Sequence, residues 1–226
     1  MWCIGKLNAS FIAAMERILF LYEECGRNPD PDYPLVVFDE KPFQLLGQEE
    51  EPLPTKPGQP KREDYKYTRN GTACLLVAYA PFLGKRFVWV SPKRRAYDYA
   101  YFIKWLLEQC LPKAKGIILV QDNLNTHCVE SLYKTFSAPE AFALDRKIEW
   151  HYTPVNASWL NMAEIEIHAL TVQGLRNRRF DSMKAVTKQL DQLVKERNEK
   201  AIKVNWRFSV ENARDKFERF YSKLNS

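Results

Sequence analysis

Two aspartates stand where apolar runs that predict buried strands come to an end. "LVVFD" closes on Asp39, and "IILVQD" closes on Asp122. Short apolar runs of this kind are typical of strands buried on both faces, which have no packing use for a carboxylate. Sites in open α/β sheets form at the carboxyl ends of the strands. If the two strands are parallel neighbours, Asp39 and Asp122 lie close together at one edge of the sheet.

Two ionised carboxylates that lie close together repel each other, and a proton or a cation relieves the repulsion. Oxygen ligands favour Mg²⁺ or Mn²⁺. A third acid is available on the helix predicted over residues 158–175, where Ser158 is a plausible N-cap and Glu164 and Glu166 follow. These glutamates are two positions apart, about 200° around a helix, so only one can face the site. Helix geometry leaves both open.

Each of these acids also has an interpretation without any chemical role. An aspartate after a strand is often a turn residue or caps the next helix, and a helical glutamate is most often at the surface. Other chemistries fit less well. "VVFDEK" lacks the second aspartate of a phosphatase loop, because Lys41 stands in its place. The chain contains neither GxxxxGK[ST] nor GxSxG, and its five cysteines and three histidines show no zinc-site spacing.

The excess positive charge of the chain lies in its last quarter. Net charge over all 226 residues is +6. Residues 171–226 hold 14 Lys and Arg against 7 Asp and Glu, whereas residues 1–170 hold 20 against 21. This distribution suits a polyanion contacted by the C-terminal part, although a solvated basic helix face would look the same. The cysteine usage, with no signal peptide and no apolar run of ~18–20 residues, predicts a cytoplasmic protein.

The order of predicted elements indicates an α/β fold with a mixed sheet, because a hairpin precedes strands that alternate with helices. The helices are expected at 7–26, 97–111, 128–136, 158–175 and 181–198, with a last one from Ser209. The strands are expected at 35–39, in a hairpin over 69–92, at 117–122 and at 148–154. Residues 49–64 contain four prolines and no periodicity, which predicts an extended loop.

Several blocks together resemble the DDE transposases of bacterial insertion sequences, in the mariner-like superfamily. They are "VVFDE", "QLLG", "RNGT", "VQDNLNTH" and "HYTPVNASWLNMAEIEI", and the resemblance covers essentially the whole chain. It implies a ribonuclease-H-like fold, with a five-stranded mixed sheet flanked by helices. We therefore expect a linker helix region at residues 1–30 and the catalytic domain with its C-terminal helices at 31–226.

The resemblance also implies the site. Carried over by motif, the metal-binding catalytic triad is Asp39, Asp122 and Glu164, which chooses between the two glutamates. Two Mg²⁺ or Mn²⁺ ions are expected, with Asp39 bridging both and the other two acids each holding one. Asn123, Asn125 and His127 would support the site around the metal ligands, and Arg176, Arg178 and Arg179 would contact DNA phosphates. A helix-start role for His127 and a solvated helix end for the arginines are the alternatives.

The implied activity is cleavage and transfer of DNA strands in cut-and-paste transposition. The partners would be the element ends, the target DNA and a second copy of the chain assembled on DNA, with the proline-rich loop reaching toward that copy. No membrane is implied, and the protein would associate with the bacterial nucleoid when bound to DNA.

Two departures from the family pattern are expected to matter. Asp122 and Glu164 are 42 positions apart, longer than the commonest spacing, and "TFSAPEAFALDRK" would absorb the difference as extra helix. The chain also begins where the linker to the catalytic domain would begin, without the helix-turn-helix modules that bind terminal repeats. A truncated remnant that does not transpose, or another ribonuclease-H-like nuclease, therefore stays open as an alternative.

Overall fold

A computed structural model describes residues 8–49 and 66–222. The predicted loop at 49–64 lies outside these residues apart from Glu49. The described strands are β1 (Leu35–Gln48), β2 (Tyr67–Ala80), β3 (Lys85–Ser91), β4 (Ile117–Gln121) and β5 (Ile148–Tyr152). The described helices are α1 (Ala9–Arg27), α2 (Ala96–Trp105), α3 (Val129–Thr135), α4 (Ala138–Asp145), α5 (Met162–Leu170), α6 (Met183–Glu199), α7 (Val210–Lys216) and α8 (Glu218–Tyr221).

The five strands form one mixed sheet in the order β3-β2-β1-β4-β5. β1, β2 and β3 are antiparallel neighbours, whereas β1, β4 and β5 run parallel to one another. The predicted hairpin and mixed sheet are confirmed. The parallel pairing of β1 with β4 was the condition for bringing Asp39 and Asp122 to one edge, and it is met.

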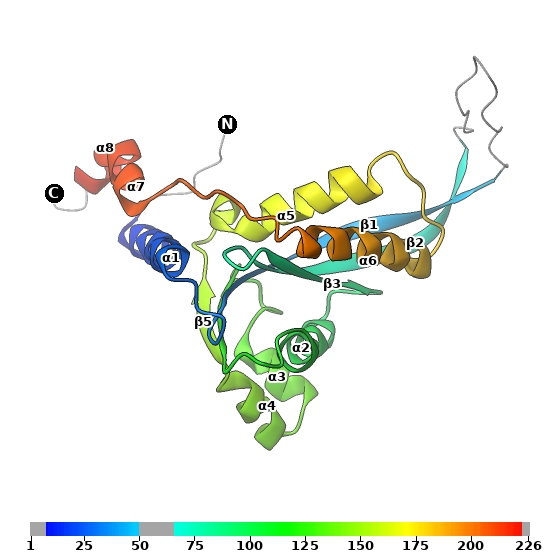
Figure 1. The fold of residues 1–226 in the computed structure, drawn as a ribbon, viewed down its shortest axis with the longest axis horizontal. Coiled ribbons are helices and arrows are strands. Elements are labelled where there is room, and N and C mark those ends of the chain that lie inside the picture. Colours follow the sequence, from blue (N-terminus) through cyan, green and yellow to red (C-terminus); the bar gives the residue numbers. More distant parts are fainter. Residues whose placement is uncertain (1–7, 50–65, 223–226) are drawn as a thin grey trace, which may run out of the picture.

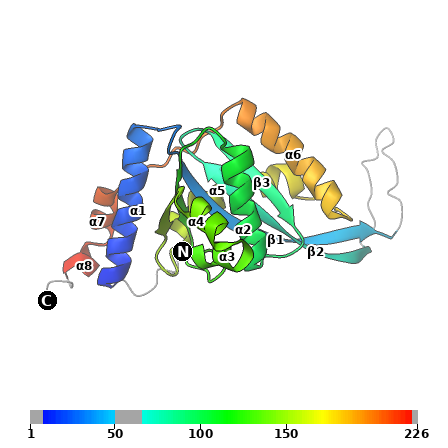
Figure 2. The same cartoon turned by 90° about the horizontal axis from the view of Figure 1, so that it is seen from below.

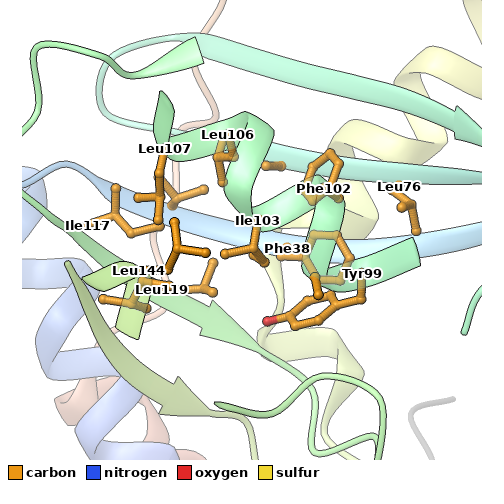
Figure 3. Close-up of a cluster of buried hydrophobic side chains, with 14 of the residues drawn as sticks. Phe38, Leu76, Tyr99, Phe102, Ile103, Leu106, Leu107, Ile117, Leu119 and Leu144 are labelled. Carbon is orange, nitrogen blue, oxygen red and sulfur yellow. The ribbon is translucent and has the colours of Figure 1, made fainter. Parts of the chain in front are cut away.

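Helices cover both faces of the sheet (Figure 1), as the strands' apolar residues require. Along β1, Val36 and Phe38 face a core beneath α2, α3 and α4, which Figure 3 shows in close-up. Val37 faces the other way, into a core built with α1, α5 and α7. Farther along that second face, α6 packs over β2 and β3. Because successive side chains of a strand alternate between faces, both layers need apolar residues, which explains the continuous runs.

The strand over 35–39 does not end at Asp39, so that prediction is wrong. β1 continues for nine more residues because β2 keeps pairing with it, up to Gln48 opposite Tyr67. Beyond the helices these two strands run on as a two-stranded arm (Figures 1 and 2). The apolar run stops at Phe38 because the parallel pairing with β4 stops beside it, after Val37. The end of the apolar run in the sequence predicts where the core ends, but it does not predict where the strand ends.

The helix predicted over 158–175 is divided. Residues Ser158–Leu160 form one turn of 3₁₀ helix, α5 follows, and Thr171–Leu175 form a π turn. Asn161 caps α5 by accepting from the Ala163 N–H at 3.0 Å, so the choice of Ser158 as the cap is wrong. The other helices form close to where they were expected, with Asn8 capping α1 and Ser209 capping α7. The "TFSAPEAFALDRK" stretch contains α4.

Within residues 8–49 and 66–222, none of the helices combines the length and the apolar character needed to cross a membrane.

Candidate active site

The parallel register sets Asp39 and Asp122 at the same level of the sheet. Val37 on β1 is paired with Val120 on β4, and each aspartate lies two residues farther along its strand. Two residues is one full repeat of the strand alternation, so both carboxylates continue the face that Val37 and Val120 present to α5. The sequence-based placement of Asp122 directly after a buried strand is confirmed.

Asn161 fastens the start of α5 to β1 beside Asp39. Its Nδ2 donates to the Phe38 carbonyl at 2.8 Å and lies 3.4 Å from Asp39 Oδ2. Its Oδ1 caps the helix at the same time. Asn161 is buried, and this double role places the first turn of α5, which contains Glu164, over the end of the parallel strands.

The two glutamates of α5 have opposite environments. Glu164 is exposed and lines an open cleft together with Asp39, Glu40, Lys41, Ile167 and His168. Glu166 is buried and forms ion pairs with Arg86 (3.1 Å) and Arg197 (2.9 Å). Glu166 is therefore committed to a structural ion pair, and Glu164 is the glutamate that reaches the cleft. Helix periodicity left this choice open, and the role of Glu164 as a metal ligand stays a prediction from the family resemblance.

Electrostatics distinguish the two aspartates. Burial raises the pKa of Asp39 to about 7, and the charges of Glu40, Asp122 and Glu164 contribute to the rise. Burial would also raise the pKa of Asp122, but the hydrogen bond and the charge of His127 outweigh it and hold that pKa below its ordinary value. A buried carboxyl with a raised pKa beside other acidic side chains marks a place where a cation would be favoured.

His127 is the predicted supporting residue with the most contacts. Its Nδ1 lies 2.5 Å from Asp122 Oδ1, and its Nε2 lies 2.7 Å from Glu40 Oε2. Burial would lower the pKa of His127, but the two carboxylates raise it to about 9. Asn123 and Asn125 are exposed. Asn123 lines a second hollow beside Asp122, and the Asn125 carbonyl accepts from the Cys128 thiol.

The three predicted DNA-binding arginines follow α5 at the far end of its π turn. Arg176 is exposed. Arg178 is exposed and bonds Gln189 on α6 at 2.7 Å. Arg179 donates to the Lys66 carbonyl at 2.9 Å and lies over the Tyr67 ring. Two of the three thus also secure the connection between α5, α6 and β2, which the sequence did not indicate.

The possible metal ligands at this edge of the sheet are carboxylates, which Mg²⁺ and Mn²⁺ prefer. Their chemical type therefore suits a divalent cation. Burial is the main cause of the raised pKa of Asp39, and the neighbouring carboxylates, whose charge such a cation would offset, add to it. As placed among the described residues, no three acidic, histidine or cysteine side chains converge into a coordination shell. The fold therefore gathers the acids at one place without closing them around an ion.

A family model described as DDE superfamily endonuclease matches residues 34–187, about two-thirds of the chain. This chain belongs to the DDE superfamily of endonucleases. The matched span includes all three predicted acids. No curated protein sequence matches the chain significantly.

The fold is that of a mariner transposase catalytic domain. The crystal structure of the catalytic domain of Mos1 mariner transposase superposes with a TM-score of 0.56 at 14% identity, covering 100% of this chain and 98% of that one. The Mos1 paired-end complex with Mn gives 0.57 at 16% identity and covers 99% of this chain. The Mos1 strand transfer complex gives 0.57 at 16% and covers 100%. The predicted ribonuclease-H-like fold class is confirmed. This chain spans 65% of the Mos1 chains in those two complexes.

Sequence reasoning missed two residues that lie around the candidate site and support it, Asn161 and Glu40. An asparagine two residues before "AE" at a helix start is a recognisable N-cap signal, but its second bond to β1 is a tertiary contact. Glu40 directly follows Asp39, where the predicted strand was expected to stop. Its burial against His127 depends on the continuation of β1.

Proposed function

We propose that this chain is the catalytic domain of a transposase, which cleaves DNA strands and transfers them in cut-and-paste transposition. The observation that carries the proposal is that Asp39 and Asp122 come from adjacent parallel strands, and that the charges of Asp122 and of Glu164, on a helix tied to β1 by Asn161, both act on Asp39. Membership of the DDE endonuclease superfamily supports it. The Mos1 structures that share the fold were solved as paired-end and strand-transfer complexes.

Asp39, Asp122 and Glu164 are the residues that would hold two divalent cations, Mg²⁺ or Mn²⁺. When bound, such ions activate a water or 3′-hydroxyl nucleophile and stabilise the leaving 3′-oxygen of a phosphodiester. The protein supplies the rest. His127 holds Asp122 in one orientation, and Asn161 keeps Glu164 over the strand ends. The open cleft admits an extended backbone to the carboxylates.

The proposal extends to the partners. DNA, as element ends and target, would approach the cleft, with Arg176, Arg178 and Arg179 contacting phosphates from the end of α5. Asn123 and Asn125, exposed beside Asp122, would contact the scissile strand or steady its loop. A second copy of the chain would join on DNA.

Residues 1–30 would serve as the linker region and 31–226 as the catalytic domain. Origin in a bacterial insertion sequence, and a location on the nucleoid, rest on the sequence resemblance.

Nicking of supercoiled plasmid in Mn²⁺ tests the proposal. We expect weak nicking with little sequence preference, abolished by a chelator, and reduced about a hundred-fold or more by Asp122→Asn. Asp32→Asn is the matched control, because Asp32 is an exposed acid paired with Lys115 before β1 begins, and it should nick as the parent does. Equal nicking by Asp122→Asn and the parent would place the activity elsewhere.

A further inference from the structure

Glu40 is a buried carboxylate that the proposed chemistry does not use. It follows Asp39 on β1 and therefore points to the opposite face of the sheet, the one that Phe38 shares with α2. Its side chain is 5% exposed. An ionised group withdrawn from water is costly unless a charged partner compensates for it, so the partners of Glu40 indicate what holds it there.

Four charged side chains alternate in sign from the loop before α2 to the tip of β4. Arg94 Nη1 lies 3.5 Å from Glu40 Oε1, and Glu40 Oε2 lies 2.7 Å from His127 Nε2. His127 Nδ1 then lies 2.5 Å from Asp122 Oδ1. Glu40 Oε2 has no well-aligned hydrogen-bond donor among the described residues, so the charge of His127 compensates for its burial.

The His127 side chain is held in place between Glu40 and Asp122 by the residues around it. Its side chain is 3% exposed, and its ring contacts Phe38 edge-on at 5.0 Å between centroids and Tyr99 at 5.1 Å. Each ring nitrogen faces a carboxylate oxygen. Nδ1 lies within hydrogen-bonding distance of Asp122 Oδ1, and the Glu40 carboxylate lies against Nε2. The position of the ring therefore depends on both acids.

Asp122 is an acid that such a support would orient. It follows the last residue of β4, and its side chain is 43% exposed. A side chain at a strand tip has rotational freedom that metal binding would have to remove. The bond from His127 removes part of that freedom beforehand. Groups that orient the ligands of a metal in this way typically change metal affinity about ten- to a hundred-fold.

We propose that Glu40 is a positioning residue, which fixes His127 and through it orients Asp122 for a divalent cation. Glu40 is not itself a ligand in this proposal, because His127 and Arg94 engage its two oxygens. The inference rests on the proposed function in one respect, that Asp122 binds the cation.

The test is Mn²⁺ binding by the purified chain, followed by electron paramagnetic resonance of the free ion, beside plasmid nicking as a function of Mn²⁺. Glu40→Gln keeps the shape and removes the charge. We expect it to weaken Mn²⁺ binding about ten-fold and to raise by a similar factor the Mn²⁺ concentration for half-maximal nicking. The nicking rate at saturating Mn²⁺ should stay within about two-fold of the parent, because Glu40 does not touch the reacting atoms.

A double-variant cycle distinguishes positioning through His127 from an independent effect. His127→Gln should weaken binding at least as much as Glu40→Gln, and the double variant should be no weaker than His127→Gln alone. Glu40→Asp, which keeps the charge, should recover part of the loss. Glu40→Asp also keeps the inference testable if Glu40→Gln does not fold. Glu149→Gln is the matched control, because Glu149 lies 2.7 Å from His151 in a second glutamate–histidine pair, on β5, and it should bind Mn²⁺ as the parent does.

Unchanged Mn²⁺ binding in Glu40→Gln, or losses that multiply in the double variant, would overturn the inference while leaving the proposed function intact. A parent chain that neither binds Mn²⁺ nor nicks DNA would overturn both.

Discussion

Asp39 is the acid of the candidate site whose pKa is raised, first by burial and then by the charges of its neighbours. Its carboxyl is partly buried, and the charges of Glu40, Asp122 and Glu164 act on it together. The pKa of Asp122 is lowered instead, because His127 donates a hydrogen bond to it and supplies a positive charge. The titration of Asp39 therefore reports on the whole site, and it gives a prediction that needs no DNA.

Without metal, the free energy of unfolding should fall as pH rises from about 4 to about 7. The pKa of Asp39 is about 7 in the folded chain against an ordinary 3.8, so in this window the folded state retains a proton that the unfolded chain has lost. Raising the pH then favours the state with fewer protons, which is the unfolded one. Denaturant unfolding in a chelator across this range measures the slope.

Asp39→Asn removes this titration and should flatten the slope over the same window. Mn²⁺ should stabilise the parent at the upper end of the range, where Asp39 is ionised, and should stabilise Asp39→Asn much less. Identical pH profiles for the parent and the variant would show that Asp39 has an ordinary pKa and that the acids do not interact.

At the scale of single elements, α5 carries two glutamates in opposite environments, one in the core and one at the cleft. Glu166 holds Arg86 of β3 and Arg197 of α6 in a buried triad, so it joins three elements on one face of the sheet. Arg86 is fully buried and also bonds the carbonyls of Gly84 and Ile202. Glu164, two residues earlier, leaves the packing alone and faces the cleft.

The two glutamates should therefore respond oppositely to the same substitution. Glu166→Gln leaves two buried guanidinium groups without a full countercharge and should destabilise the fold by about 3–5 kcal/mol. Glu164→Gln should change stability by no more than about 0.5 kcal/mol while abolishing Mn²⁺-dependent nicking. Thermal unfolding and nicking assays on both variants check this. A stable Glu166→Gln, or an active Glu164→Gln, would reverse the assignment of the two roles.

At the scale of the whole molecule, the charge of the chain is concentrated in residues 171–226, which include α6, α7, α8 and the segment that follows α5. The remainder is close to neutral. If this part of the chain contacts DNA as proposed, binding would release counterions from the DNA backbone, and log affinity should fall linearly with log salt concentration.

Arg176→Ala tests whether the end of α5 belongs to that surface. Arg176 is exposed and follows α5's π turn, so its removal should weaken duplex binding about equally for all sequences and reduce the salt slope by about one. Lys115→Ala is the control, because Lys115 is an exposed cation that pairs with Asp32 beside the beginning of β4. Fluorescence anisotropy over a salt series measures both. An equal loss for the two variants would mean that binding is spread over the whole surface.

The sequence by itself determined the order of elements, the mixed character of the sheet, and Asp39 and Asp122 as the acids at the ends of buried runs. These features follow from local pattern, because apolar runs and caps are written in consecutive residues. It could not show that β1 continues past Asp39, since that depends on β2 supplying hydrogen-bond partners from farther along the chain.

Only the tertiary structure decided which glutamate of α5 is committed to the core and what the buried neighbours of Asp122 are. Glu166 is buried because arginines from β3 and α6 meet it there, and Glu40 is buried because His127 returns over β1 from the loop after β4. Charges from distant segments compensate for one another only once the chain has brought them together. No local pattern contains that information, because a lone glutamate in a sequence looks the same whether its partner is water or an arginine.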